Sequence, residues 1–189
     1  KSYKDLPTAV YQIQTKYRDE LRAKSGVLRG REFGMKDLYS FHLTQEDLEA
    51  FYARALETYL RIYQRCGLDS RAVEASGGSF TKKLSHEFQV LTEAGEDTIV
   101  LCESCSFAQN AEVATVKAGD ACPSCGKTVV SKTGIEVGNI FDLNTKFTDA
   151  FDFSVQDEKG EQRRVLMGCY GLGTTRLVGA IVATCHDDR

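Results

Sequence analysis

Two stretches of the sequence are the most informative about the fold: YQIQTKYRDE at 11–20 and LRGREFGMKDLYSFH at 28–42. Apolar and polar residues alternate along 10–20 and again along 32–43, and this alternation predicts two β-strands. The segment 22–30 between them contains three basic residues and two glycines, which is typical of a loop. We therefore expect the two strands to form a long hairpin.

The predicted hairpin concentrates charged side chains, and successive side chains of a strand point to opposite faces. If the relevant faces coincide, one surface holds cations, carboxylates and an aromatic ring: Lys16, Arg18, Glu20, Arg29, Arg31, Phe33, Met35 and Asp37. Guanidinium groups bind phosphate oxygens with a forked geometry, and a ring can stack on a base, so this combination suits a nucleotide. A solvated β-ribbon would show the same alternation, and the pattern alone leaves both interpretations open.

The rest of the chain is predicted to hold two helices and several short strands. Thr44 and the acidic residues after it are typical of a helix N-terminus, and apolar residues recur at helical spacing as far as Cys66. A second helix is expected at 174–184. Strands are expected at 71–75, 86–92, 98–101, 134–143, 151–156 and 162–170. Mostly antiparallel strands with few helices predict the α+β class.

Composition indicates an ordinary globular domain. The 189 residues are 42% hydrophobic and 27% charged, and the net charge of −3 argues against a stand-alone nucleic-acid binder coated with Lys and Arg. No run approaches the roughly 18 apolar residues of a membrane span, and no signal peptide is visible. We therefore expect a cytoplasmic protein without membrane association. Both ends of the sequence read as cut from a longer chain.

Four of the seven cysteines form two C-x-x-C pairs, Cys102 with Cys105 and Cys122 with Cys125. An odd number of cysteines without a secretory signal argues against a disulfide framework. Two such pairs can complete a tetrahedral Zn²⁺ site, and four thiolates leave no open position, so the predicted role is structural. Four free cysteines are the alternative.

The segment 168–176, GCYGLGTTR, leads from a predicted strand into the last predicted helix. A dinucleotide-binding fingerprint would need a different glycine spacing and an acidic residue about 20 positions further on, so we reject that interpretation. Glycines let the backbone approach a ligand closely, with Arg176 presented by the helix. A tight strand-to-helix turn with a surface arginine is the alternative.

The hairpin residues are similar to motif 2 of the bacterial prolyl-tRNA synthetases, a family of class II aminoacyl-tRNA synthetases. The resemblance implies that Arg18 binds the ATP α-phosphate and the amino-acid carboxylate, and that Glu20 faces the adenine amine. It further implies that Arg29 reaches the γ-phosphate and that Phe33 stacks on adenine. Met35 would line the proline side.

The segment 168–176 resembles motif 3 of the same family, which implies that Arg176 binds the γ-phosphate. Two further segments, SHEFQV at 85–90 and GIEVG at 134–138, also resemble the family. They make Glu87 and Gln89 candidates for the magnesium or substrate face. By the same resemblance Glu136 approaches the amino acid.

Several positions depart from the family pattern. Gly34 stands where a Leu is common, and Leu38 where a small residue is common. Asn139 replaces the usual His, and Asp142-Leu143-Asn144 replaces Gln-Leu-Gly, close to the expected proline pocket. None of these changes removes one of the groups that the resemblance assigns to ATP.

The resemblance covers essentially the whole chain and implies the class II fold, an antiparallel β-sheet flanked by helices, with a small zinc-binding insert. We expect a motif 2 half at 1–101, a four-cysteine insert at 102–133 and a motif 3 half at 134–189. The implied reaction is attack of the proline carboxylate on the α-phosphorus of ATP with Mg²⁺, followed by transfer to tRNA(Pro). The intact enzyme is expected to be a homodimer.

The resemblance also implies that parts of the enzyme lie outside this sequence: motif 1 and the proline-holding Thr-x-Glu loop upstream, and the anticodon-binding domain downstream. Such a chain should fold around the hairpin and bind proline weakly. Related enzymes can carry an editing domain between similar cysteine pairs, but the 16 residues 106–121 are too few for a domain, so we expect no editing function. The alternative to an enzyme is a non-catalytic, zinc-containing binding module.

Overall fold

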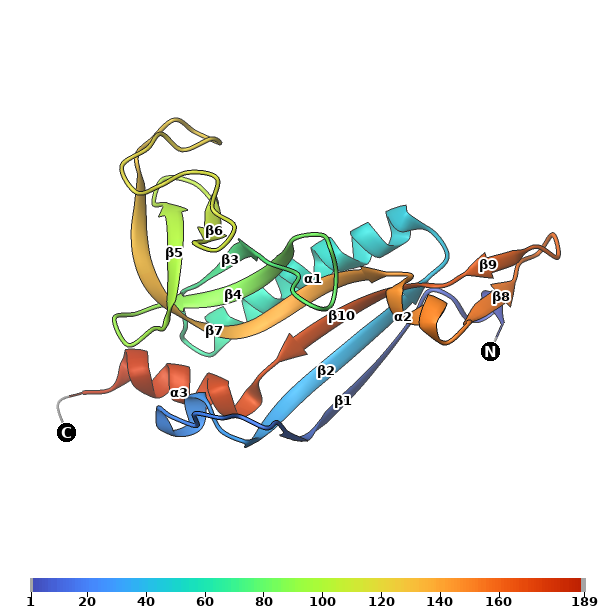
Figure 1. Ribbon diagram of the computed structural model, residues 1–189, viewed down its shortest axis with the longest axis horizontal. Coiled ribbons are helices and arrows are strands. Elements are labelled where there is room, and N and C mark those ends of the chain that lie inside the picture. Colours follow the sequence, from blue (N-terminus) through green and yellow to red (C-terminus); the bar gives the residue numbers. More distant parts are fainter. Residues whose placement is uncertain (1, 188–189) are drawn as a thin grey trace.

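An eight-stranded sheet forms the body of the structure, a computed structural model that describes residues 2–187 (Figure 1). Its strands are β1 (Thr8–Tyr17), β2 (Glu32–His42), β3 (Ser70–Ala75), β4 (Ser85–Leu91), β5 (Asp97–Cys102), β6 (Ala108–Asn110), β7 (Val129–Asn144) and β10 (Leu166–Leu172). A separate hairpin pairs β8 (Ser154–Gln156) with β9 (Gln162–Arg164). The helices are α1 (Gln45–Arg65), α2 (Lys146–Ala150) and α3 (Thr174–Cys185), with 3₁₀ turns at Tyr3–Asp5 and Gly26–Leu28. The expected α+β class is confirmed.

The strands follow the order β1-β2-β10-β7-β4-β3-β6-β5, and β7 also pairs with β5. Residues 134–144 of β7 pair with β4 and β10, whereas residues 129–134 pair with β5. Strands β7, β4, β3, β6 and β5 therefore close into a ring of pairings, seen where β5 and β6 rise from the sheet in Figure 1. The strand pairs are antiparallel except for a single parallel pairing between β3 and β6.

The predicted hairpin is confirmed. Strands β1 and β2 pair from Thr8 opposite Phe41 to Tyr17 opposite Glu32. Register places Lys16 opposite Phe33, so these two side chains share a face. The helix predicted after Thr44 is also confirmed, and the Thr44 hydroxyl accepts a hydrogen bond from the Asp47 amide at 3.2 Å.

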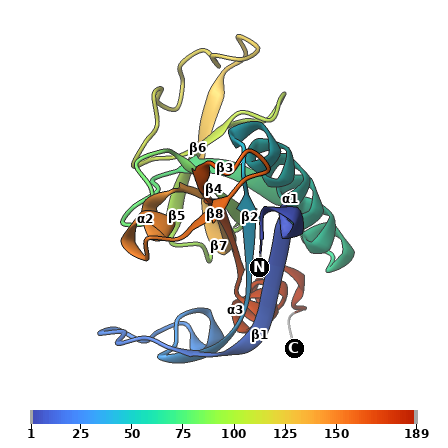
Figure 2. The ribbon, with the colours of Figure 1, turned by 90° about the vertical axis from the view of Figure 1, so that its right-hand side faces the viewer.

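Helix α1 covers one face of the sheet, and α2 lies on the other side of it (Figure 2). The aromatic residues of α1 belong to the core: Tyr59 and Tyr63 are buried, and the Tyr59 ring stacks on the Phe88 ring with centroids 5.0 Å apart. On β2, Leu38 packs into this core and Lys36 donates to the Tyr170 carbonyl at 2.9 Å. Because strand residues alternate, the intervening odd-numbered residues of β2 face away from α1.

The structure differs from the predictions between residues 144 and 166. The predicted strand 151–156 is wrong in its first half, because the short helix α2 precedes it and β8 begins only at Ser154. Asn144 has a φ of +49°, which ends the extended course of β7, and asparagine tolerates this conformation better than most residues. The predicted strand 162–170 is split into β9 and β10, and between them the Val165 carbonyl accepts the Thr148 hydroxyl at 2.7 Å.

The strand predicted at 134–143 begins five positions earlier, at Val129, so β7 crosses the expected boundary at 133. The division into 1–101, 102–133 and 134–189 stays a prediction. Within residues 2–187, no helix combines the length and the apolar character that crossing a bilayer would require.

Candidate functional site

Alternation accounts for the strand residues of the predicted surface, Lys16, Phe33, Met35 and Asp37. The other four predicted residues lie in the loop beyond the strand ends, so alternation does not place them: Arg18, Glu20, Arg29 and Arg31. Lys16 Nζ lies 2.6 Å from Asp37 Oδ2, an ion pair that joins the two strands on the face away from α1. The Arg18 guanidinium lies over the Phe33 ring, 5.0 Å from its centroid. Arg18 is exposed while Phe33 and Met35 are half-buried, so a flat ligand that stacks on this face of the ring has to move the guanidinium aside.

The loop of the hairpin is held by ion pairs. Arg29 Nε donates to Glu20 Oε2 at 3.0 Å, and this hydrogen bond lowers the pKa of Glu20 below its ordinary value. Glu96, in the turn between β4 and β5, lies 3.0 Å from Lys24 Nζ and 3.6 Å from Arg29 Nη1. Arg29 is thus placed between two carboxylates, and a phosphate would compete with them for it.

Strands β4, β5 and β7 form an acidic surface, here called the acidic floor, from Glu87, Gln89, Asp97 and Glu136. Gln89 is fully buried, and its amide donates to Glu87 Oε2 at 3.0 Å and to Asp97 Oδ2 at 2.8 Å. Asn110 donates to the same Glu87 oxygen at 3.3 Å. Burial raises the pKa of Glu87 even though these two amides oppose the shift. The amides hold two carboxylates in fixed positions on this floor.

A β-bulge in β7 places Glu136 and Asn139 on the same side of the sheet. Gln89 pairs with Glu136, Phe88 with Gly138 and Glu87 with Asn139, so one extra residue of β7 interrupts the alternation. Gly138 faces α1, because a Cβ there would lie 2.3 Å from the Tyr63 hydroxyl. Asn139 can therefore hydrogen-bond to the Glu136 carboxylate, although the two are three positions apart.

Arg176, in the first turn of α3, completes the site. A narrow cleft joins the hairpin loop, the 94–96 turn and α3, lined by Leu28, Arg29, Ala94, Glu96, Ile135 and Arg176. Arg176 Nε is buried and has no hydrogen-bond partner among residues 2–187. This buried donor lacks a protein acceptor, and an anionic ligand would supply one if the cleft opened to admit it.

Glu136 is the most perturbed carboxyl group of the site. Burial raises its pKa from 4.5 to about 7; the charges of Glu87 and Asp97 add to this rise, and Arg176 opposes it. Glu136 is therefore partly protonated near neutral pH until a cation approaches it.

This perturbation makes stability depend on pH. Between about pH 4.5 and 7 the unfolded chain releases the Glu136 proton while the folded chain keeps it, so the free energy of unfolding falls as pH rises through this window. Glu136→Gln removes the ionisation. We expect it to raise the free energy of unfolding by roughly 1–3 kcal/mol at pH 8 and to change it little at pH 4.5. Urea unfolding at both pH values measures this, with the exposed Glu158→Gln as control; equal effects at the two pH values would contradict it.

The four cysteines of the C-x-x-C pairs form a second cluster at the far end of β5 and β7. All four Sγ atoms lie within 4.8 Å of one another, with Cys102 and Cys125 at 3.5 Å and Cys105 and Cys122 at 3.6 Å. A tetrahedral Zn²⁺ with Zn–S bonds of about 2.3 Å needs sulfur atoms roughly 3.8 Å apart. The cluster is therefore compatible with a zinc ion.

The predicted ATP and proline residues gather on two neighbouring surfaces. The hairpin supplies Arg18, Glu20, Arg29, Phe33 and Met35, and the floor supplies Glu87, Gln89 and Glu136, with Arg176 in the cleft beside Arg29. The sequence did not point to three other members. Glu96 and Asp97 lie in a segment whose sequence indicates only a turn, and Asn110 belongs to no sequence motif.

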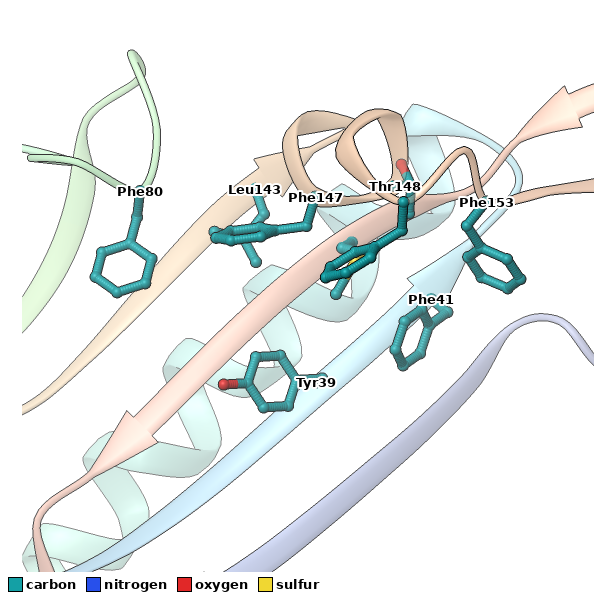
Figure 3. A pocket seen from close by; sticks show the side chains of 9 residues that line it. Tyr39, Phe41, Phe80, Leu143, Phe147, Thr148 and Phe153 are labelled. Carbon is teal, nitrogen blue, oxygen red and sulfur yellow. The ribbon is translucent and has the colours of Figure 1, made fainter. Parts of the chain in front are cut away.

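A cavity among the described residues lies apart from this candidate site. It measures about 520 Å³ and is lined mainly by aromatic and aliphatic side chains: Tyr39, Phe41, Phe80, Leu143, Phe147, Thr148, Phe151, Phe153 and Met167 (Figure 3). It contains none of the predicted site residues and no charged group.

Comparison with known proteins gives a consistent family. The family model of the tRNA synthetase class II core domain (G, H, P, S and T) matches residues 1–185. The chain is 42% identical to a proline–tRNA ligase of Sulfurimonas denitrificans, over 99% of this chain and 47% of that protein. It is 41% identical to a probable mitochondrial proline–tRNA ligase of Rattus norvegicus, over 96% of this chain and 38% of that protein.

A third relative gives a longer alignment than the first two. The proline–tRNA ligase of Moorella thermoacetica is 27% identical in an alignment of 336 residues, which covers 100% of this chain and 59% of that protein. The alignment is much longer than the 189 residues of this chain, so that relative contains internal residues without a counterpart here. The chain spans about half, or less, of the length of the first two relatives.

Proposed function

The chain belongs to the class II tRNA synthetase core-domain family, and we propose that it is a catalytic-domain portion of a proline–tRNA ligase. It would activate proline with ATP and transfer it to tRNA(Pro), as the names of its relatives suggest. The observation that carries the proposal is the convergence of Arg29 and Arg176 on one cleft, beside the Arg18–Phe33 pair.

The ATP side follows from the hairpin. Phe33 would stack on adenine, with the Glu20 carboxylate accepting a hydrogen bond from the adenine amine. Arg18 would bind the α-phosphate and the proline carboxylate, which brings the nucleophile and the phosphorus together. Arg29 and Arg176 would hold the γ-phosphate through charge-assisted hydrogen bonds.

The proposed reaction forms a bond between the proline carboxylate oxygen and the α-phosphorus, and pyrophosphate leaves. No covalent bond to the protein is needed, so positioning and charge neutralisation supply the catalysis. The tRNA 3′ end would then accept the prolyl group.

The amino-acid side and the magnesium site would be built on the acidic floor. Met35, Gln89 and Glu136 would line the proline pocket, and the proline ammonium group would favour the ionised form of Glu136. Glu87 offers a carboxylate oxygen, the donor type that Mg²⁺ prefers, close to Asp97. When bound with ATP, Mg²⁺ would offset phosphate charge.

The four-cysteine cluster would hold a structural Zn²⁺ through Cys102, Cys105, Cys122 and Cys125, because the sulfur separations fit a tetrahedron. The short segment between the cysteine pairs supports the absence of an editing domain from this chain. A homodimeric intact enzyme and a cytoplasmic location stay predictions.

Titration calorimetry with ATP and Mg²⁺ tests the proposal. We expect dissociation constants in the micromolar to millimolar range for ATP. GTP should bind at least roughly tenfold more weakly, because guanine presents a carbonyl where Glu20 needs an amine donor. Equal affinity for the two nucleotides, or no binding of ATP, would contradict the proposed site and favour a non-catalytic module.

A further inference from the structure

Strand β10 stops pairing with β2 just before helix α3 begins. The last register pair is Leu172 opposite Lys36. An extended continuation would bring residue 174 opposite Gly34, but the chain turns at Gly173 and enters α3 at Thr174. The Gly34 amide would thus lose its partner at the point where the ladder ends.

The Thr175 side chain takes the place of the missing strand. Its hydroxyl oxygen accepts a hydrogen bond from the Gly34 amide at 2.7 Å, across 141 positions of sequence. The approach depends on glycine, because a Cβ at position 34 would lie 2.6 Å from Thr174 Oγ1 and 3.1 Å from Thr175 Oγ1. Two threonine hydroxyls and a glycine therefore fit together at this junction.

The junction connects two residues of the proposed ATP site. Phe33 directly precedes Gly34, and Arg176 directly follows Thr175. The helix has Gly173 as its N-cap without a side-chain capping bond, so the Thr175 hydroxyl ties the first turn of α3 to the sheet. Arg176 Nε has no hydrogen-bond partner within residues 2–187, so no hydrogen bond at that atom helps to hold the side chain in place.

We infer that Thr175 is a positioning residue, whose hydroxyl bond to the Gly34 amide fixes Arg176 relative to Phe33 in the ATP site. This inference rests on the proposed function, since it concerns how that site holds ATP. Thr175 acts through Arg176 and the strand, and no direct contact with the nucleotide is assigned to it.

Thr175→Val keeps the shape of the side chain and removes the hydroxyl, whereas Thr175→Ser keeps the hydroxyl. We expect Thr175→Val to weaken ATP binding by about five- to tenfold, the effect of one lost hydrogen bond and an unpaired amide. Thr175→Ser should stay within about twofold of the native chain. Equal affinities for native and Thr175→Val chains, or a Thr175→Ser chain as weak as Thr175→Val, would overturn the inference.

A double-mutant cycle separates positioning from general loosening of the fold. If Thr175 acts through Arg176, Thr175→Val should cost no further affinity in an Arg176→Ala background. An effect of full size in that background would overturn the inference, because it would mean that the hydroxyl supports ATP binding by another route.

Binding of no ATP by the native chain would contradict the proposed function. In that case NMR spectroscopy without nucleotide still tests the inference about Thr175. In ¹⁵N-labelled protein, the Arg176 Nε–Hε resonance and the Gly34 amide report on the junction directly. We expect both signals to match in native and Thr175→Ser chains, and the Arg176 signal to shift or broaden in Thr175→Val. An Arg176 signal that is unchanged in Thr175→Val would overturn the inference whatever the calorimetry gives.

Discussion

Replacing Arg18 with alanine is expected to lower the affinity for ATP with Mg²⁺ by about a hundredfold, equivalent to roughly 2.7 kcal/mol. The reason is that the proposed site places this guanidinium on the α-phosphate, where a forked, charge-assisted pair is among the strongest polar contacts. In the structure Arg18 is exposed and lies over Phe33, so its loss should hardly affect folding. Calorimetry gives the affinity, and urea unfolding checks that the fold is retained.

Two further variants sharpen this test. Arg18→Lys keeps the charge but loses the planar fork, so its affinity should fall between those of the native and alanine chains. Arg163→Ala removes an arginine that pairs with Asp157 at 3.0 Å in the β8–β9 hairpin, and it should leave ATP binding unchanged. An Arg18→Ala chain that binds ATP as well as Arg163→Ala would place the phosphate somewhere else.

Replacing Cys122 with serine is expected to abolish stoichiometric Zn²⁺ binding and to lower the free energy of unfolding by about 3 kcal/mol or more. Cys122 is buried in a cluster with Cys102, Val100 and Val129, and so belongs both to the proposed metal site and to its apolar support. Metal analysis of the purified chain and urea unfolding measure the two effects.

The matched control is Cys185→Ser, because Cys185 is exposed and lies outside the four-cysteine cluster. That variant should keep one Zn²⁺ per chain and the stability of the native protein. A native chain purified without zinc that gains no stability on adding Zn²⁺ would favour four free cysteines. A metal-free chain that regains its stability with Zn²⁺, while Cys122→Ser does not, would support the structural site.

Local sequence pattern was sufficient to predict the hairpin, α1 and the cysteine cluster. Alternation in 10–20 and 32–43 and the helical spacing after Thr44 each depend on residues close together in sequence, so they could be read directly. The same pattern failed at 151–156, where a positive φ at Asn144 and a contact between Thr148 and Val165 redirect the chain. Those features come from packing, which no periodicity reports.

Sequence patterns were enough to predict the α+β class, a charged hairpin, the grouping of two C-x-x-C motifs and the family. How these parts come together is visible only in the folded chain. The bulge at Val137 turns Asn139 toward Glu136, Glu96 reaches Arg29, and Gly34 bonds to Thr175 across 141 positions. Short-range patterns specify which face a side chain takes within its own element, whereas a site is made by contacts between elements distant in sequence.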